Sequence, residues 1–189
     1  MMGSDPGPTR AAKRARPPLD AEGLERLGLF YAGRYATTRA RLADYLRRKL
    51  RERGWGGTGA PPVEALVERF AGLGYVNDAA FAEARAGSLL RRGYGERRVA
   101  QALRAAGIDA DDAAPARAEA ERQAEEAALR FARRRRIGPY AERPPADDRE
   151  GREARRKAAA AMLRAGHRLD LVRRILDASP GELPDPDLA

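Results

Sequence analysis

Apolar residues recur along this chain with the period of an α-helix. Leu42, Tyr45, Leu46 and Leu50 fall at spacings of three and four positions, which places them on one helical face. A stripe of the same kind occupies 63–73, and shorter ones follow at 99–106, 129–131 and 172–176. We expect the stripe at 129–131 to lie in a long helix rich in Ala and Arg. No segment alternates as a half-buried strand does, so the pattern predicts an all-α protein.

Short polar residues and glycines mark the expected helix ends. Thr37 or Thr38, Asn77 and Asp109 each precede a periodic segment, where a side-chain oxygen can accept the unpaired N–H groups of a first turn. A glycine follows several of these segments, where a residue that adopts positive φ ends a helix at low cost. These glycines are Gly54, Gly74, Gly93, Gly107 and Gly166.

Three of these helix ends form an internal repeat. Segments 50–55, 103–108 and 162–167 each place an apolar residue four positions before the glycine, and nearly equal intervals separate them. Each interval has room for three short helices, which are too few to bury an apolar face alone. We therefore expect three tandem three-helix repeats that form an elongated, curved helical array. The expected divisions are a disordered basic N-terminal arm (1–19), the repeats (20–75, 76–116 and 117–177) and a disordered acidic tail (178–189).

The charge balance indicates an anionic partner. Lys and Arg number 37 against 28 Asp and Glu, which gives a net charge of +9 and a pI near 10.5. Such a field attracts nucleic acids or acidic protein surfaces. An alternative is that abundant Ala, Arg, Gly and Pro reflect a GC-rich genome, which raises the Arg content without a partner. The clustering of the positive charge favours a polyanion-facing surface.

Several classes of protein are disfavoured by composition. The chain has no Cys, which rules out disulfides and thiolate metal sites and fits a reducing cytoplasm. No apolar run reaches the ~20 residues of a membrane-spanning helix, and the N-terminal segment has no apolar stretch typical of a signal peptide. We expect a cytoplasmic protein that does not contact membranes.

No constellation of residues predicts catalysis or a cofactor. Residues 54–59 match the dinucleotide-binding pattern G-x-G-x-x-G, but an expected helix precedes them where that motif requires a strand. We therefore expect a flexible loop there. The single histidine, His167, stands at a helix end, and Asp109, Asp111 and Asp112 open a helix, where negative charge is favoured. We expect no cofactor, no metal and no enzymatic activity.

Basic clusters are the informative feature, and each expected repeat carries at least one. Alone, each cluster is more typical of a solvated helix face, whereas together they are suited to line one surface that follows a phosphate backbone. Trp55 and Tyr94 are the aromatic residues considered for stacking on bases. The candidate contact residues are Arg47, Arg48, Lys49, Arg91, Arg92, Arg97, Arg98, Arg133, Arg134, Arg135, Arg136, Arg155, Arg156 and Lys157.

The sequence resembles the RecX family. Residues 74–82, Gly-Tyr-Val-Asn-Asp-Ala-Ala-Phe-Ala, are similar to the family's G-Y-[LI]-[DN]-D-x-x-F-[AV] segment. Residues 91–95 and 103–108 follow in the family's order and spacing, and the resemblance runs from about 24 to 176. One departure is that Thr38 is followed by Arg41, so the family's capping box loses its carboxylate. The third repeat is another, because it is rich in Ala and Arg and has few of the family's bulky residues.

The resemblance implies a regulator of recombination and DNA repair that binds RecA. It implies a protein that lies in the groove of the RecA–DNA filament and lowers the ATPase, strand-exchange and coprotease activities of RecA. We expect the RecA filament as partner, with single- and double-stranded DNA as further partners, and a monomeric protein. The alternative is a basic helical nucleic-acid-binding protein without RecA specificity. A hydrolase or transferase that uses Asp78 with Asp111 or Asp112 is disfavoured, since no base, nucleophile or phosphate loop accompanies them.

Overall fold

The protein is described by a computed structural model that covers residues 16–142, 148–179 and 182–183. Within these ranges the chain is all-helical, and its only extended pairing is an isolated bridge between Leu19 and Trp55. The helices are α1 (Ala21–Arg34), α2 (Arg39–Arg53), α3 (Val63–Gly72), α4 (Asp78–Arg91), α5 (Glu96–Ala105), α6 (Ala110–Arg122), α7 (Ala124–Arg135), the short 3₁₀ helix η1 (Gly138–Tyr140), α8 (Arg149–Arg164) and α9 (Leu169–Asp177).

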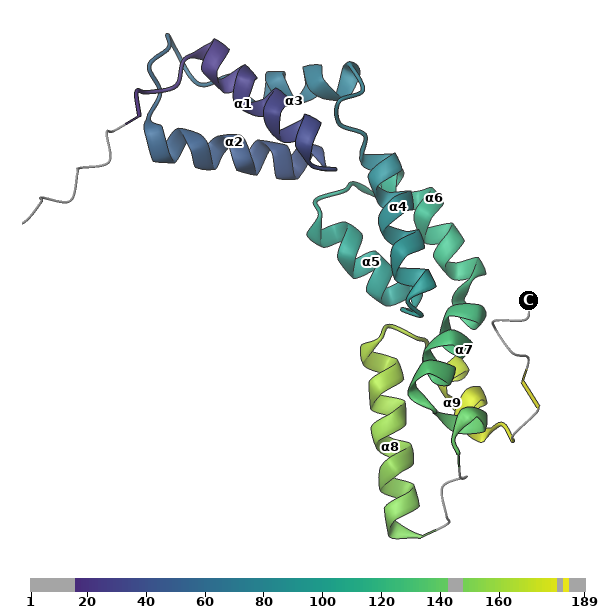
Figure 1. Cartoon of the computed structure of the whole chain (residues 1–189). Helices are drawn as coiled ribbons and strands as arrows, with labels where there is room; N and C mark the ends of the chain where they lie inside the picture. Colours follow the sequence, from purple (N-terminus) through teal and green to yellow (C-terminus); the bar gives the residue numbers. More distant parts are fainter. Residues whose placement is uncertain (1–15, 143–147, 180–181, 184–189) are drawn as a thin grey trace, which may run out of the picture.

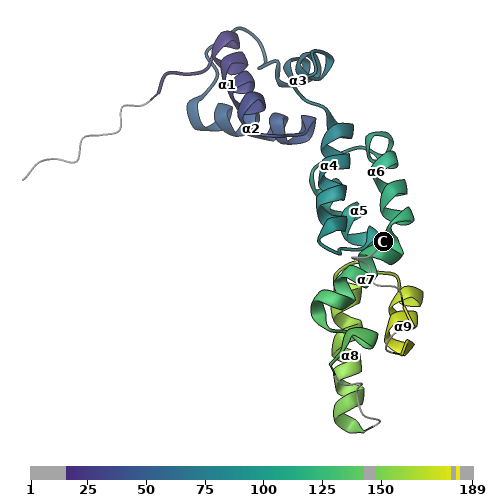
Figure 2. The ribbon, with the colours of Figure 1, turned by 45° about the vertical axis from the view of Figure 1, so that its right-hand side comes forward.

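The helices form three groups of three that follow one another along an arc. Figures 1 and 2 show α1–α3 at one end, α4–α6 in the middle and α7–α9 at the other end. Each group encloses a hydrophobic core of its own. The predicted all-α fold with three tandem three-helix repeats in an elongated, curved array is confirmed.

The three cores differ in the size of their side chains. The first contains Phe70 and several leucines, whereas the second contains a series of alanines such as Ala82, Ala86 and Ala116. Small side chains let α4 and α6 approach closely. The third core combines Phe131, Met162 and Ile175.

Helix ends follow the predicted chemistry. Thr38, Asn77 and Asp109 are N-caps, and each side chain accepts a backbone N–H from the first turn of α2, α4 or α6. All of the predicted terminating glycines have positive φ, from 70° at Gly93 to 96° at Gly166. Thr38 keeps its cap although the reciprocal carboxylate is missing, so the hydroxyl alone is sufficient to begin α2.

The expected segment boundaries shift at three places. Leu19, which we expected in the arm, is buried in the first core and pairs through its backbone with Gly54 and Gly56. The loop at 54–59 is therefore held against it rather than being flexible. The boundary expected between 116 and 117 falls inside α6, and the Ala- and Arg-rich segment is divided into α6 and α7 at Gln123. Most of the expected arm (1–15) and most of the tail (180–181 and 184–189) lie outside the described residues.

Two junctions join neighbouring repeats, and both use the same positions of the repeat. At the first junction the N-cap of α2, Thr38, donates its hydroxyl to the carbonyl of Ala106 at 2.6 Å. At the second junction the N-cap of α5, Gly95, donates its backbone N–H to the carbonyl of Ala165 at 2.9 Å. Both acceptors directly precede a helix-ending glycine. Two of the three repeat glycines found in the sequence, Gly107 and Gly166, therefore mark the contacts between repeats.

Each junction has further polar contacts. At the first, the backbone N–H of Arg39 donates to the buried carboxylate of Asp78 at 2.9 Å. At the second, the N–H of Arg97 donates to the carbonyl of Gly166 at 3.2 Å. His167 is 1% exposed, and its Nε2 lies 3.1 Å from the carbonyl oxygen of Gly93. These bonds satisfy the donors and acceptors that they join, whereas Nδ1 of His167 is buried without a hydrogen-bond partner in the described part of the chain.

Candidate functional site

The second helix of each repeat lies on the inner side of the arc (Figure 1). All three of these helices, α2, α5 and α8, contain predicted basic residues. The remaining candidates lie at the C-terminal ends of α4 and α7, where positive charge is favoured by the helix dipole. All of the candidates are exposed except the half-buried Lys49. The candidates on the inner helices are Arg47, Arg48 and Lys49 of α2, Arg97 and Arg98 of α5, and Arg155, Arg156 and Lys157 of α8. The candidates at helix ends are Arg91 and Arg92 at the end of α4, and Arg133, Arg134, Arg135 and Arg136 at the end of α7.

Part of this charge is neutralised by carboxylates of the same protein. Arg47 donates to Glu64 of α3 at 2.6 Å, and this hydrogen bond lowers the pKa of the Glu64 carboxyl. Lys49 lies 2.6 Å from Glu52, and Lys157 lies 2.7 Å from Glu153. Arg155 pairs with Asp177 of α9, and Arg136 pairs with Glu142. These pairs are largely exposed, so an incoming anion can compete for the cations at small cost.

Four arginines, three from helices and one from a turn, line one groove in the middle of the molecule. Arg41 comes from α2, Arg85 from α4, Arg92 from the turn after α4 and Arg98 from α5. The groove has a volume of about 350 Å³. In the described part of the chain, none of the four guanidinium groups has a carboxylate within ion-pair distance. This groove therefore concentrates uncompensated positive charge around a concave surface.

The groove includes only two of the predicted contact residues, Arg92 and Arg98. Arg97, the neighbour of Arg98 in sequence, lines a separate depression between α5 and α6 together with Arg117 and Glu121. Arg41 and Arg85 were not predicted. The signal that could have found Arg85 is its position seven residues before Arg92, which places both on the same side of α4 and the turn after it.

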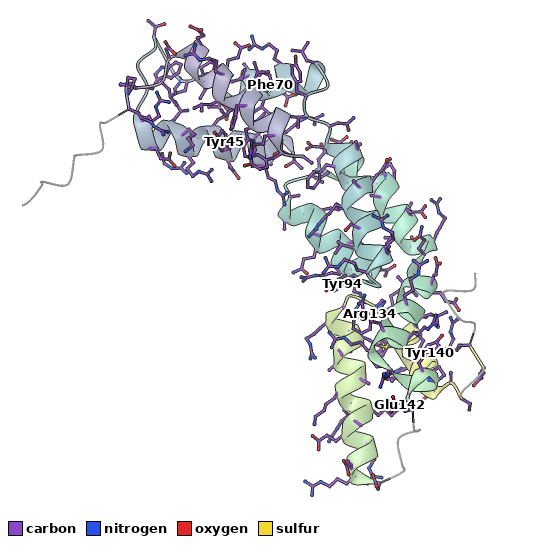
Figure 3. The ribbon with its side chains drawn as sticks, in the orientation of Figure 1. Tyr45, Phe70, Tyr94, Arg134, Tyr140 and Glu142 are labelled. Atoms are coloured by element: carbon purple, nitrogen blue, oxygen red, sulfur yellow. The ribbon has the colours of Figure 1, made fainter. Side chains whose placement is uncertain are left out.

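Of the two aromatic residues predicted to stack on bases, Tyr94 lines the groove with the four arginines and Trp55 does not. Tyr94 is half-buried where the second and third repeats meet (Figure 3), and the guanidinium carbon of Arg92 lies 5.3 Å from the centre of its ring. Trp55 packs against the first core and donates its indole N–H to the carbonyl of Gly59 at 2.9 Å. The exposed aromatic rings are those of Phe30, Tyr35 and Tyr75.

The acidic residues and the histidine considered for catalysis have structural contacts. Asp78 and Asp112 both bond to Arg39, through its backbone N–H and its guanidinium respectively. Burial lowers the pKa of His167 to about 4, so the imidazole is neutral at physiological pH. Among the described residues, no three His, Asp or Glu side chains gather where they could hold a metal ion. None of the described helices is long and apolar enough to span a bilayer.

The chain is similar to known proteins over most of its length. Residues 77–116 match the family model described as RecX, second three-helix domain. Regulatory protein RecX from Myxococcus xanthus (strain DK1622) is 33% identical over 185 residues, which cover 94% of this chain and 96% of that protein. The crystal structure of RecX from Lactobacillus salivarius superposes with a TM-score of 0.64 at 20% identity, covering 83% of this chain and 96% of that one, and shows the same fold. The chain belongs to the RecX family of regulatory proteins.

Proposed function

We propose that this protein binds the RecA recombinase filament and restrains it. In this proposal it acts in the cytoplasm as a regulator without catalytic activity, and it lowers filament assembly, ATPase, strand exchange and coprotease activity. The observation that carries the proposal is the alignment with Regulatory protein RecX, which extends over almost the whole of both chains. A match of that extent includes all three repeats.

The arrangement of the repeats supports contact with a long partner. The inner helices α2, α5 and α8 present positive charge at three places along the arc. Several weak contacts on one rigid body act together, because the first contact raises the effective concentration of the others. A filament that repeats its own surface offers acidic groups or DNA phosphates to each of these places. We infer that the basic residues of α2, α5 and α8 face the filament.

A basic nucleic-acid-binding protein without RecA specificity is the second candidate function. The net charge of +9 and the groove lined by four arginines favour it. The two functions differ in one measurable property, because a filament regulator binds RecA-coated DNA more tightly than the same DNA alone.

Fluorescence anisotropy of the labelled protein tests this proposal. The protein is titrated with RecA filaments assembled on single-stranded DNA, and separately with the DNA alone, at several salt concentrations. The substitutions Arg48→Glu and Arg156→Glu reverse one exposed charge each on α2 and α8. Together they should weaken filament binding by at least about tenfold and flatten its dependence on salt.

The matched control carries Arg117→Glu and Arg173→Glu, which change the total charge equally on α6 and α9. This control should bind the filament nearly as tightly as the unaltered protein. An equal loss of filament affinity in both variants would show that binding depends only on the total charge of the protein. Binding to bare DNA as tight as binding to the filament would move the assignment to the second candidate function.

A further inference from the structure

A second, apolar groove continues from the arginine groove at Arg85. It lies at the junction of the first two repeats, has a volume of about 500 Å³ and is lined by the end of α1, the loops after α1 and α3, and one side of α4. Tyr35, Tyr75 and Phe81 supply its aromatic wall. Arg85 lines both grooves. The guanidinium carbon of Arg41, in the arginine groove, lies 5.0 Å from the ring centre of Phe81, in the apolar groove. The two grooves are therefore neighbours.

The aromatic side chains of the second groove are accessible. Tyr35 is 51% exposed and Tyr75 is 55% exposed. Neither groove is lined by an acidic residue. One part therefore offers rings to a flat apolar group, and the adjoining part offers guanidinium groups to anions.

We propose that the two grooves together bind a short segment of single-stranded nucleic acid. The phosphates lie against Arg85, Arg92 and Arg98, and at least one base stacks on Tyr35 or Tyr75. Such sites join a positive groove that follows the backbone with aromatic rings that accept any base. A double-stranded segment offers phosphates but keeps its bases paired inside the helix, so it uses only the arginine part.

An acidic peptide matches the charge of the arginine groove but leaves the exposed tyrosines without a planar partner. A single strand satisfies both parts, and this favours nucleic acid over protein as the occupant. The inference rests on the second candidate function and deepens it, because it names the site and the kind of nucleic acid that binds there, and it requires no recombinase. Its test is carried out with the protein alone, and failure would leave the RecA proposal untouched.

The experiment measures binding of a labelled oligothymidylate of about ten nucleotides, a length typical of single-strand sites. Arg92→Gln with Arg98→Gln should weaken binding by at least about tenfold. This variant should also reduce the slope of log K against log salt by about 1.4, since each lost phosphate contact on a single strand contributes about 0.7. The control Arg117→Gln with Arg173→Gln removes the same charge elsewhere and should keep the original slope.

The aromatic part has a separate test. Tyr35→Ser with Tyr75→Ser should weaken binding of oligothymidylate by at least about fivefold, the lower limit for one lost stacked base, and leave the salt slope unchanged. An abasic oligonucleotide of the same length should bind this variant and the unaltered protein equally. Equal loss of affinity for both probes would overturn the stacking arrangement.

Chemical protection supplies a readout that needs no variant. Phenylglyoxal modification of the unaltered protein, followed by mass spectrometry, should show that oligothymidylate protects Arg41, Arg85, Arg92 and Arg98 but not Arg117 or Arg173. Equal protection of the four groove arginines and the two control arginines would contradict the proposed binding site. Equally tight binding of duplex DNA or polyglutamate would also contradict it, because neither offers free bases to the tyrosines.

Discussion

The two junctions occupy equivalent positions in the repeat but are built from different chemistry. Side chains join the first and second repeats, since Thr38 donates a hydroxyl and Asp78 accepts a backbone N–H. Backbone contacts backbone between the second and third repeats, where Gly95 and Gly166 leave no room for a side chain. The comparison shows that one repeat geometry is maintained mainly by polar side chains at the first junction and, apart from the contact of His167 with Gly93, by backbone hydrogen bonds at the second.

A methyl group added at Gly166, the repeat glycine of the second junction, should give the largest effect. At Gly166 a Cβ would lie 2.5 Å from the backbone nitrogen of Arg98 in the preceding repeat, and φ is already 96°. Gly166→Ala should therefore lower the free energy of unfolding by at least about 3 kcal/mol. Gly74→Ala is the matched control, because Gly74 also has positive φ and ends its helix with the same pair of backbone hydrogen bonds, but an added Cβ meets no atom within 4 Å. It should cost only about 1 kcal/mol.

Urea unfolding of these two variants measures the difference. Equal loss of stability at Gly74 and Gly166 would contradict the inferred contact. Hydrogen exchange localises the effect, since the amides of Gly95 and Arg97 donate across the second junction and should lose protection in Gly166→Ala.

Gly107 allows a compensating substitution that Gly166 does not. A Cβ at Gly107 would overlap the Cβ of Ala40, a side chain of the first repeat. Gly107→Ala should destabilise the protein by more than about 2 kcal/mol, and adding Ala40→Gly should restore at least about 1 kcal/mol of it, because the overlapping methyl group is removed. A double variant no more stable than Gly107→Ala would refute the contact. No single methyl deletion should rescue Gly166→Ala, whose clash includes backbone atoms.

Acid should weaken the second junction selectively. Burial lowers the pKa of His167 from 6.5 to about 4, so the unfolded chain binds a proton between these values while the folded chain does not. Stability should therefore fall as the pH drops from 6.5 to 4, by up to about 3 kcal/mol. At the first junction burial raises the pKa of Asp78, and this shift has the opposite sign, favouring the folded state as the pH falls.

Replacement of His167 by Gln separates this contribution from the other titrating groups. The variant keeps a donor for the carbonyl of Gly93 but has no titrating ring. The loss of stability between pH 6.5 and pH 4 should be smaller in His167→Gln than in the unaltered protein. An identical pH profile of unfolding in both proteins would contradict the assignment.

Removal of the Thr38 hydroxyl should have the smallest effect of the series. Thr38→Val keeps the shape of the buried side chain but loses both the bond to the carbonyl of Ala106 and the N-cap of α2. The free energy of unfolding should fall by about 2 kcal/mol. Thr38→Ser keeps the hydroxyl and should lose less in thermal unfolding; a Ser variant as unstable as the Val variant would show that packing, not the hydrogen bond, matters there.

The sequence predicted those parts of the fold that depend on local chemistry. The caps at Thr38, Asn77 and Asp109 and the glycine ends act within a few residues, so their positions could be found without tertiary structure. The end of α6 at Arg122 was missed because Gln123 and its neighbours all favour a helix. That end depends on packing, since Ala127 belongs to the second core and Ala128 to the third.

The candidate surface was predicted less well for a geometric reason. Runs of basic residues are visible in sequence, but the arginine groove combines side chains from α2, α4 and α5. Successive residues on a helix point about 100° apart, so Arg97 and Arg98 line different depressions. The role of Gly107 and Gly166 between repeats was likewise hidden, because the repeat pattern shows where a glycine stands but not what it touches.

The single-strand-dependent ATPase of RecA from the same organism tests the central claim most directly. The protein is titrated into the reaction below one molecule per RecA, beside the variant with Arg48→Glu and Arg156→Glu. The account predicts that the unaltered protein lowers ATP hydrolysis at these ratios and that the charge-reversed variant requires a higher concentration for the same effect. ATP hydrolysis that stays unchanged up to equimolar protein, with the fold intact by circular dichroism, would contradict it.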